Sequence, residues 1–278
     1  MTLPLRCASA PAVRALRAGG WRGVLAAHYD HTVNVGCAGW IVNLSAAAPQ
    51  SVCSAQVDVA ALAWLRTLAI GQVVELSPPG REVSMAPVLG VWPPDRAARG
   101  ILHGGRVGTW FDTPEGHRFG APRLACAARA AAALALGDPA SDGPALDGPA
   151  PGEPVPASAA FADLLGVGIG LTPAGDDALV GMLAALTVAG VNVASLRALA
   201  GLLTPSDGAT TDVSATILRL ALAGEFSLPL HAVLAAIGDA ERLPRAVEAL
   251  RGWGATSGRD TVAGLDALAT AWAAERKE

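Results

Sequence analysis

A stretch of biased composition near the middle of the chain divides it into two parts of different character. Residues 137–160 read GDPASDGPALDGPAPGEPVPASAA, with six prolines, four glycines and four acidic residues. Such a stretch cannot bury enough apolar surface to form a packed core, so it is typical of a linker or a long surface loop. A proline-rich docking segment is the alternative, but no P-x-x-P flanked by arginine is present. We therefore expect two domains, at residues 1–136 and 161–278.

The first part carries short runs of β-prone residues separated by glycine and polar residues. The expected strands are 23–27, 32–37, 40–44, 51–57, 72–76 and 106–111. Helical spacing predicts a helix over 59–70, with Asp58 as its N-cap, and an alanine-rich helix over 123–136. Many short strands with glycine-rich turns predict a small antiparallel β-barrel or sandwich with one or two helices.

The second part is expected to be all-helical, which makes the whole chain an α+β protein. Glycine, proline or a capping residue bounds each run of helical spacing. The expected helices are 161–165, 173–189, 195–203, 211–223, 228–238, 243–250 and 257–274. Residues 178–196 lack a charge, but this stretch is rich in alanine and glycine and contains a helix stop at Gly190 and Asn192. It therefore predicts a buried core helix rather than a membrane span.

Charge and lysine content exclude several classes of function. The chain of 278 residues has a net charge of −4 and no run of basic residues, which argues against nucleic acid as a partner. Lys277 is the only lysine among 20 basic residues. The chain therefore has no lysine for a Schiff base or a P-loop. Any phosphate must be held by arginine, backbone N–H groups or a metal.

Cysteines and histidines give no sign of a metal centre or of serine hydrolase chemistry. None of the four cysteines forms a C-x-x-C pair, and their spacing fits neither a zinc site nor a disulfide framework. Free cysteines and the absence of an apolar leader segment predict a cytoplasmic protein. His28 and His31 would face opposite sides of a strand. His103-Gly104-Gly105 has no G-x-S-x-G motif to accompany it.

The most distinctive motif is GVGIGLTPAGDD at residues 166–177. Thr172 is the expected N-cap of a helix, with Pro173 at its first position, so free N–H groups at the helix end would form an anion site. Asp176 and Asp177 lie one turn further and could hold Mg²⁺ against a bound phosphate. The structural alternative is a tight glycine turn that starts a helix, with two acids that complement the helix dipole.

A second helix start, GATSGRD at residues 254–260, repeats the spacing of the first. Thr256 precedes Asp260 by four residues, as Thr172 precedes Asp176. We hypothesise that the two helix ends converge on one ligand. A capping box formed by Ser257 and Asp260 is the structural alternative, although it leaves Arg259 unexplained. Capping also accounts for the polar cluster at residues 210–214.

Three motifs in order resemble one bacterial family. They are GVGIGLTPAGDD, TTDVSATILRLALAGEF and GATSGRDTVAGL. The family includes the AllH-type subunit of oxamate carbamoyltransferase, from anaerobic allantoin catabolism, and the resemblance is strongest over residues 166–265. Its members read closer to GLGPGLTPSGDD, so Ile169 and Ala174 replace a proline and a serine here. The change at Ala174 removes a hydroxyl donor at the helix end.

The resemblance implies carbamoyl transfer between oxamate and phosphate, with oxalurate and carbamoyl phosphate on the two sides, Mg²⁺ as cofactor and other subunits as partners. Asp176, Asp177, Arg259 and Asp260 are the expected catalytic residues, with Asp176 and Asp177 as metal ligands. The expected anion or substrate site comprises Gly166, Gly168, Gly170, Thr172, Gly175, Thr256, Ser257 and Gly258. Two alternatives stay open: a non-catalytic assembly subunit of such a complex, and a Mg²⁺-dependent enzyme that acts on a different phosphate-containing ligand.

Overall fold

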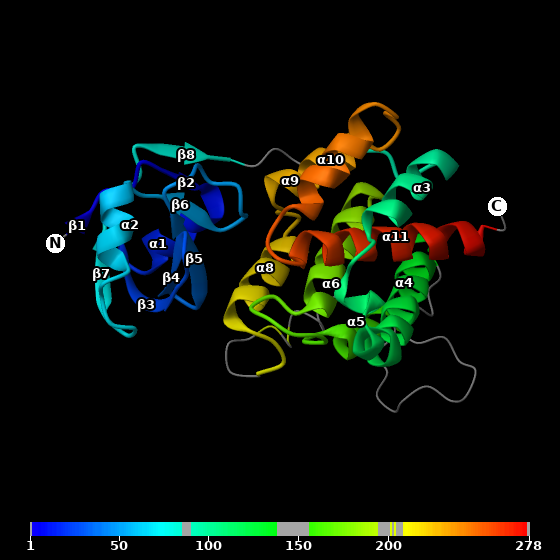
Figure 1. Cartoon of the computed structure of the whole chain (residues 1–278), viewed down its shortest axis with the longest axis horizontal. Coiled ribbons are helices and arrows are strands. Elements are labelled where there is room, and N and C mark those ends of the chain that lie inside the picture. Colours follow the sequence, from blue (N-terminus) through cyan, green and yellow to red (C-terminus); the bar gives the residue numbers. More distant parts are fainter. Residues whose placement is uncertain are drawn as a thin grey trace. The chain divides into compact units, whose positions relative to one another are not determined.

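The computed structural model describes residues 2–84, 90–137, 156–193, 201, 203 and 208–276 (Figure 1). By compactness the chain divides into one unit of Met1–Ala86 with Glu225–Leu228, and a second of Pro87–Gly224 with Pro229–Glu278. This division falls well before the expected linker at 137–160. Of that linker, residues 138–155 lie outside the described part of the chain, and residues 157–160 are helical.

The first unit is built on one curled sheet of eight strands (Figure 1). The strands are β1 (Thr2–Leu3), β2 (Cys7–Ser9), β3 (Arg22–His28), β4 (Thr32–Cys37), β5 (Trp40–Ser45), β6 (Ser54–Gln56), β7 (Val73–Leu76) and β8 (Arg81–Val83). Their order is β1-β7-β3-β4-β5-β6-β2-β8. The β-rich character is confirmed, but the sheet is neither a closed barrel nor a sandwich. It is also not purely antiparallel, because β1/β7, β5/β6 and β2/β8 pair in parallel.

Apolar side chains of the central strands create the core of this unit. In β3, Val24 is exposed while Leu25 is fully buried, and in β4 both Val33 and Val35 are fully buried. Helix α1 (Ala10–Ala18) packs against β2, β4, β5 and β6. Its N-cap is Ser9, whose hydroxyl accepts a hydrogen bond from the Ala12 N–H at 3.4 Å. This helix is not among those expected from the sequence.

Helix α2 (Val59–Leu65) is shorter than the expected helix over 59–70. Asp58 does precede it, but its side chain makes no capping hydrogen bond. The Asp58 carboxylate instead forms an ion pair with Arg6. Asp58 is thus the N-cap residue of α2, as predicted, but its side chain pairs with Arg6 of the N-terminal segment instead of making a capping hydrogen bond.

The second unit is helical. Its described α-helices are α3 (Arg96–Gly105), α4 (Ala121–Ala135), α5 (Ala157–Leu164), α6 (Ala174–Val188), α8 (Asp212–Leu222), α9 (Leu228–Ala236), α10 (Arg242–Arg251) and α11 (Ser257–Glu275). A 3₁₀ helix, η1 (Trp110–Asp112), and a π-helix, η2 (Gly116–Gly120), lie between α3 and α4. The expected helices of the C-terminal part are confirmed to within a few residues, except 195–203, most of which lies outside the described residues.

The expected strand over 106–111 is wrong. Residues 106–109 form a turn that leads into η1. Gly108 has a φ of +80° in this turn, and the Asp112 carboxylate accepts hydrogen bonds from the N–H groups of Gly108 and Thr109. A local carboxylate that captures two N–H groups favours a turn over a β ladder.

Helices α6 and α11 cross with their backbones in contact (Figure 1). A Cβ atom added at Gly181 of α6 would lie 2.2 Å from the Thr261 carbonyl oxygen, and one added at Gly264 of α11 would lie 2.0 Å from the Ala178 carbonyl oxygen. From Ala174 to Leu186, every residue of α6 is buried. This part of the helix is thus a core element, as expected, and no helix among the described residues is long and apolar enough to span a membrane.

The four cysteines are free thiols among the described residues. Cys37 is buried, its Sγ donates to the carbonyl oxygens of Ala15 and Arg22, and burial raises its pKa. We expect iodoacetamide at pH 8 to alkylate the half-buried Cys7 and Cys126 well before Cys37, because the thiolate is the reactive form. Peptide mass mapping over time checks this order. Modification of Cys37 as fast as Cys7 in folded protein would contradict it.

Candidate functional site

The glycine-rich loop between α5 and α6 folds back over the start of α6. Gly166, Gly168 and Gly170 have φ values of +72°, +113° and +104°, a region that favours glycine. A Cβ atom on Gly168 would lie 2.7 Å from the Ala174 nitrogen. The Gly175 N–H donates to the Val167 carbonyl oxygen at 2.7 Å. The loop itself therefore uses one of the N–H groups expected to hold an anion.

Thr172 does not cap α6 as expected. The helix begins at Ala174, with Pro173 in the N-cap position and not at the first helical position. The Thr172 hydroxyl lies 2.7 Å from the Ser257 hydroxyl, at the start of α11. A partner 85 residues away in the sequence has thus replaced the local capping bond.

Helix α11 also begins with a tight backbone approach. The Gly258 N–H donates to the Trp253 carbonyl oxygen at 2.9 Å. A Cβ atom on Gly258 would lie 1.7 Å from the Leu250 carbonyl oxygen, so only glycine fits there. Thr256 is the N-cap residue but makes no side-chain capping bond. The capping box of Ser257 and Asp260 is wrong, because Asp260 accepts from the Trp110 N–H at 2.9 Å instead.

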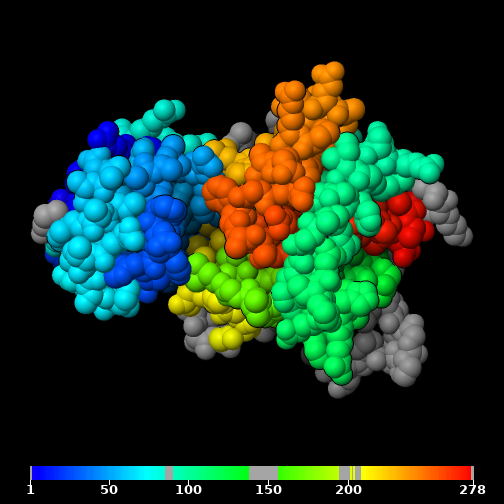
Figure 2. Space-filling model, in the orientation of Figure 1, coloured from blue at the N-terminus to red at the C-terminus, as the bar shows by residue number. Residues whose placement is uncertain are grey.

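The two helix starts meet, as hypothesised from their matching spacing. The hydrogen bond between Thr172 and Ser257 joins them directly. Hydrogen bonding from both hydroxyl groups lowers the pKa of Asp177 on α6, and the negative charge of Asp260 on α11 raises it. In Figure 2 the loop before α6 (yellow-green), the turn before α11 (orange-red) and the segment after α3 (green) adjoin at the surface. We call this region, residues 166–177 with 256–260, the joined helix starts.

Asp176 has a bracing role, because it holds the glycine-rich loop by accepting hydrogen bonds. Its Oδ1 accepts from the Gly166 N–H at 2.7 Å, and its Oδ2 accepts from the Thr210 hydroxyl. Burial raises the pKa of this carboxyl group, and these hydrogen bonds oppose the rise. Thr211 caps α8 by accepting from the Ser214 N–H at 3.1 Å, so capping explains part of the polar cluster at 210–214. Because both Asp176 oxygens already accept hydrogen bonds within the chain, the geometry gives this residue a bracing role.

Replacing Asp176 by alanine is expected to lower the free energy of unfolding by about 2–4 kcal/mol. The change leaves the Gly166 N–H and the Thr210 hydroxyl without their acceptor, and each unsatisfied group costs about 1–3 kcal/mol. Urea denaturation followed by circular dichroism measures the loss. Asp163→Ala, at an exposed position of α5, is the control. Equal urea midpoints for Asp176→Ala and wild type would contradict the bracing role.

Asp177 and Asp260 are buried acids with unsatisfied oxygens. Their side chains belong to residues that are only 7 % and 0 % exposed, and the Oδ2 atom of each has no hydrogen-bond partner. Burial raises the pKa of Asp177 well above its ordinary value, and the negative charge of Asp260 raises it further. Burial also raises the pKa of Asp260, against the lowering effect of the Trp110 N–H bond. Each of these two carboxyl groups therefore keeps one oxygen atom that no described group of the chain hydrogen-bonds.

Arg259 is half-buried beside the segment that follows α3. Its buried Nε has no hydrogen-bond partner. A Cβ atom on Gly108 would lie 3.4 Å from the Arg259 Nη1, so the turn at Gly108 lies against the guanidinium group. Among the described residues Arg259 forms no ion pair, which leaves its fork of donors open to a ligand.

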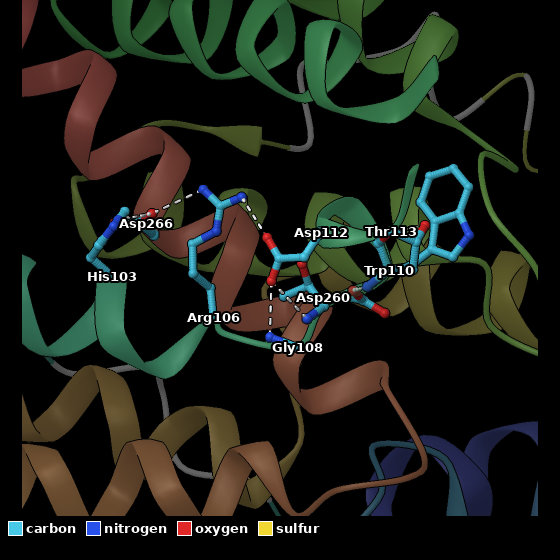
Figure 3. Close-up of polar contacts among 9 residues, drawn as sticks. His103, Arg106, Gly108, Trp110, Asp112, Thr113, Asp260 and Asp266 are labelled. Carbon is cyan, nitrogen blue, oxygen red and sulfur yellow. Dashed lines mark hydrogen bonds and ion pairs between the residues drawn. The ribbon is translucent and has the colours of Figure 1, made fainter. Parts of the chain in front are cut away.

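The segment 103–113 is the part of this region that sequence reasoning missed (Figure 3). Asp266 of α11, which is buried, accepts from the Arg106 Nη1 at 3.3 Å and lies 3.2 Å from the His103 Nδ1. Together with the Trp110–Asp260 bond, these contacts hold α3 and η1 along α11. The only local signal was the spacing of Thr109 and Asp112 at a helix start, which gives no hint of partners on α11.

Metal ligands are sparse in the described part of the chain. No group of three or more His, Cys, Asp or Glu side chains there is placed to hold a metal ion. The expected ligand Asp176 is engaged elsewhere, so the carboxylates with open oxygens are Asp177 and Asp260. A pair of carboxylates suits a cation that keeps several waters.

One of three comparisons with known proteins gives a match, and it includes this region. No curated protein and no solved structure matches the chain. One family model does match, over a range that contains both joined helix starts but not the segment 103–113. This match confirms the resemblance seen in the three motifs: over residues 164–269 the chain matches the family described as oxamate carbamoyltransferase subunit AllH.

Proposed function

We propose that the chain is a subunit of a carbamoyltransferase that interconverts carbamoyl phosphate plus oxamate with oxalurate plus phosphate. We further propose that it binds the anionic part of a substrate at the joined helix starts. The family match over residues 164–269 carries this proposal, because that range holds both helix starts and the bond between Thr172 and Ser257. Other subunits of the complex are its implied partners.

The reaction defines what the site must supply. The amide nitrogen of oxamate attacks the carbamoyl carbon, and a C–N bond forms. The bond from that carbon to the phosphate oxygen breaks, phosphate leaves with the electron pair, and the nitrogen loses a proton. Catalysis therefore needs positive charge at the phosphate and a polarised carbamoyl carbonyl.

Arg259 is the residue best placed to bind phosphate. The described part of the chain contains no lysine, and the Gly175 and Gly258 N–H groups already donate to loop carbonyls. The planar guanidinium of Arg259 offers a fork that matches phosphate oxygens. Thr172 and Ser257, which lie within hydrogen-bond distance of each other, add two hydroxyl groups at the joined helix starts. In this arrangement side chains, more than free backbone donors, hold the anion.

The residues present fit a magnesium ion. Asp177 and Asp260 have buried carboxylate oxygens without a hydrogen-bond partner, and Mg²⁺ is usually held by one or two carboxylates together with substrate phosphate. When bound, the ion would supply positive charge that stabilises the leaving phosphate. The role of the two acids is then to hold that charge next to the substrate.

A non-catalytic assembly subunit is the second candidate. At both helix starts, loop carbonyl oxygens accept hydrogen bonds from the Gly175 and Gly258 N–H groups. A Cβ atom at either glycine would clash with backbone atoms, so packing alone explains these glycines. Both observations favour the assembly role. In that case the joined helix starts would be a rigid element that other subunits recognise.

Arg259→Lys and Arg259→Ala separate the two candidates. In the reconstituted complex we expect both variants to lower oxalurate phosphorolysis, by about 10²–10³-fold for alanine, as for loss of one donor to a developing charge. Complex assembly, followed by size-exclusion chromatography, should be unchanged. Arg123→Ala, at a half-buried arginine of α4 that forms an ion pair with the exposed Asp163, is the control. Full activity of Arg259→Ala, or loss of assembly before loss of activity, would favour the assembly role.

A further inference from the structure

The Arg106 guanidinium group lies between two acids that belong to different elements (Figure 3). Its Nη1 donates to the Asp266 Oδ2 at 3.3 Å, in the middle of α11, and its Nη2 lies 3.8 Å from the Asp112 Oδ1, at the end of η1. The side chains of Asp266 and Arg106 are only 4 % and 24 % exposed. Charges that are shielded in this way are screened by salt much less than surface charges are. Arg106 therefore ties η1 to α11.

The Asp112 carboxylate connects Arg106 to the turn at Gly108, residues 106–109. Its Oδ2 accepts hydrogen bonds from the N–H groups of Gly108 at 2.9 Å and of Thr109 at 3.3 Å. A carboxylate that accepts from nearby backbone N–H groups stabilises a turn. One oxygen of Asp112 thus pairs with Arg106 while the other holds the turn. The position that Arg106 gives to this carboxylate therefore decides where the turn at Gly108 lies.

The turn at Gly108 and the start of η1 contact two residues of the joined helix starts. A Cβ atom on Gly108 would lie 3.4 Å from the Arg259 Nη1 and 3.9 Å from its Cζ, so the backbone of the turn lies along the guanidinium group. Two residues later, the Trp110 N–H donates to the Asp260 Oδ1 at 2.9 Å. The proposed function assigns Arg259 to phosphate and Asp260 to magnesium. A shift of the turn would therefore move the backbone that supports both groups.

The other side of η1 is held by packing that does not involve Arg106. The Trp110 carbonyl oxygen accepts from the Thr113 hydroxyl at 2.7 Å, and the Phe111 side chain is fully buried. The rings of Trp110 and Phe111 meet edge to face, with their centroids 5.6 Å apart. Loss of Arg106 should therefore release the turn at Gly108 and leave η1 folded.

We propose that Arg106 is a positioning residue, which fixes the turn at Gly108 by bridging two acids. Through that turn it sets the positions of the Arg259 guanidinium group and the Asp260 carboxyl group. The proposal rests on the proposed function for the chemistry of these two residues. Arg106 acts through them, so its loss should lower turnover while the fold and the assembly of the complex stay intact.

Amide hydrogen exchange on the full-length chain, followed by mass spectrometry, tests the hold on the turn without any ligand. In Arg106→Gln we expect peptides that cover residues 107–112 to exchange about tenfold faster than in wild type, with α6 unchanged. His103→Gln is the matched control. His103 lies 3.2 Å from the same acid, Asp266, but its side chain is 74 % exposed, and exposed pairs contribute little. This control should exchange as wild type does.

Two further variants guard against misfolding. Arg106→Gln alone leaves the buried Asp266 carboxylate without its guanidinium partner, which is costly. Arg106→Gln combined with Asp266→Asn removes both charges, so this double variant should fold while the turn is still released. Arg106→Lys keeps a cation but lacks the planar fork that reaches two acids, so its exchange should lie between wild type and Arg106→Gln. Thermal unfolding of each variant confirms that it is folded.

Kinetics of the assembled complex give the functional readout. We expect kcat/KM for oxalurate phosphorolysis to fall by about 10–10²-fold in Arg106→Gln and in the double variant, because a displacement of about 1 Å can cost a hundredfold in rate. The KM for phosphate should rise, since Arg259 is displaced. A variant that is merely unstable would lose active enzyme, which lowers kcat alone. His103→Gln should keep wild-type kinetics.

Two results would overturn the proposal. One is unchanged exchange over residues 107–112 in both Arg106→Gln and the double variant. The other is faster exchange in these variants with wild-type kcat and KM in an active complex. If the wild-type complex neither phosphorolyses oxalurate nor binds carbamoyl phosphate, the proposed function is wrong, and the exchange data alone decide whether Arg106 fixes the turn.

Discussion

Replacing Gly264 by alanine is expected to destabilise the helical unit by about 3 kcal/mol or more, beyond the usual 1–3 kcal/mol for an overpacked core. The added Cβ atom would lie 2.0 Å from the Ala178 carbonyl oxygen and within 3 Å of two further backbone atoms of the same residue. Backbone atoms in the middle of a buried helix cannot move aside as a side chain can. Separation of α6 and α11 would also pull apart Thr172 and Ser257, so the site should be lost with the packing.

Urea unfolding with circular dichroism measures this effect, and Gly100→Ala is the matched control. Gly100 lies inside α3, where a Cβ atom would meet nothing within 4 Å. In that control the free energy of unfolding should rise by about 0.5–1 kcal/mol, because alanine is the better helix former. A Gly264→Ala variant that unfolds at the same urea concentration as wild type would show that the two helices do not cross as closely as described.

Replacing Asp177 by asparagine is expected to abolish most of the activity of the assembled enzyme without loss of fold. We expect oxalurate phosphorolysis to fall by about 10²–10³-fold, the range seen when one stabilising group is removed from a reacting centre. The amide is nearly isosteric with the carboxyl group, and a buried neutral group costs less than a buried charge. The melting temperature in metal-free buffer should therefore stay the same or rise.

Activity assays and thermal melts on the same preparations test this prediction, with Asp163→Asn as the surface control. Retained activity in Asp177→Asn would remove the residue from the catalytic site. A collapse of the melting temperature in metal-free buffer would instead show that Asp177 serves the fold.

The two helix starts themselves could be predicted because their signals are local, whereas their meeting was a hypothesis drawn from the matching spacing. Thr172 to Asp176 and Thr256 to Asp260 share one spacing, and each lies before a long apolar helix. What this spacing could not predict is the partner of each side chain. Thr172 pairs with Ser257 in place of capping, and Asp260 accepts from Trp110, which lies 150 residues earlier. Such long-range contacts are decided by how helices pack, and a local motif carries no record of them.

The same limit applies to the fold. Runs of β-prone residues separated by glycine and polar residues predicted the strands β3 and β4. Such runs could not predict that β5 and β6 pair in parallel, because β-prone residues suit strands of either direction. Residues 106–111 have β-prone side chains, yet Gly108 and the Asp112 carboxylate turn the chain into η1.

Calorimetric titration of carbamoyl phosphate into the protein, alone and in complex with its partner subunits, shows whether the joined helix starts bind the anionic part of a carbamoyl transfer substrate. We predict binding that requires Mg²⁺ in wild type and is lost in Asp177→Asn, with Asp163→Asn unchanged. Absence of binding to the wild-type complex, or equal binding by wild type and Asp177→Asn, would contradict it.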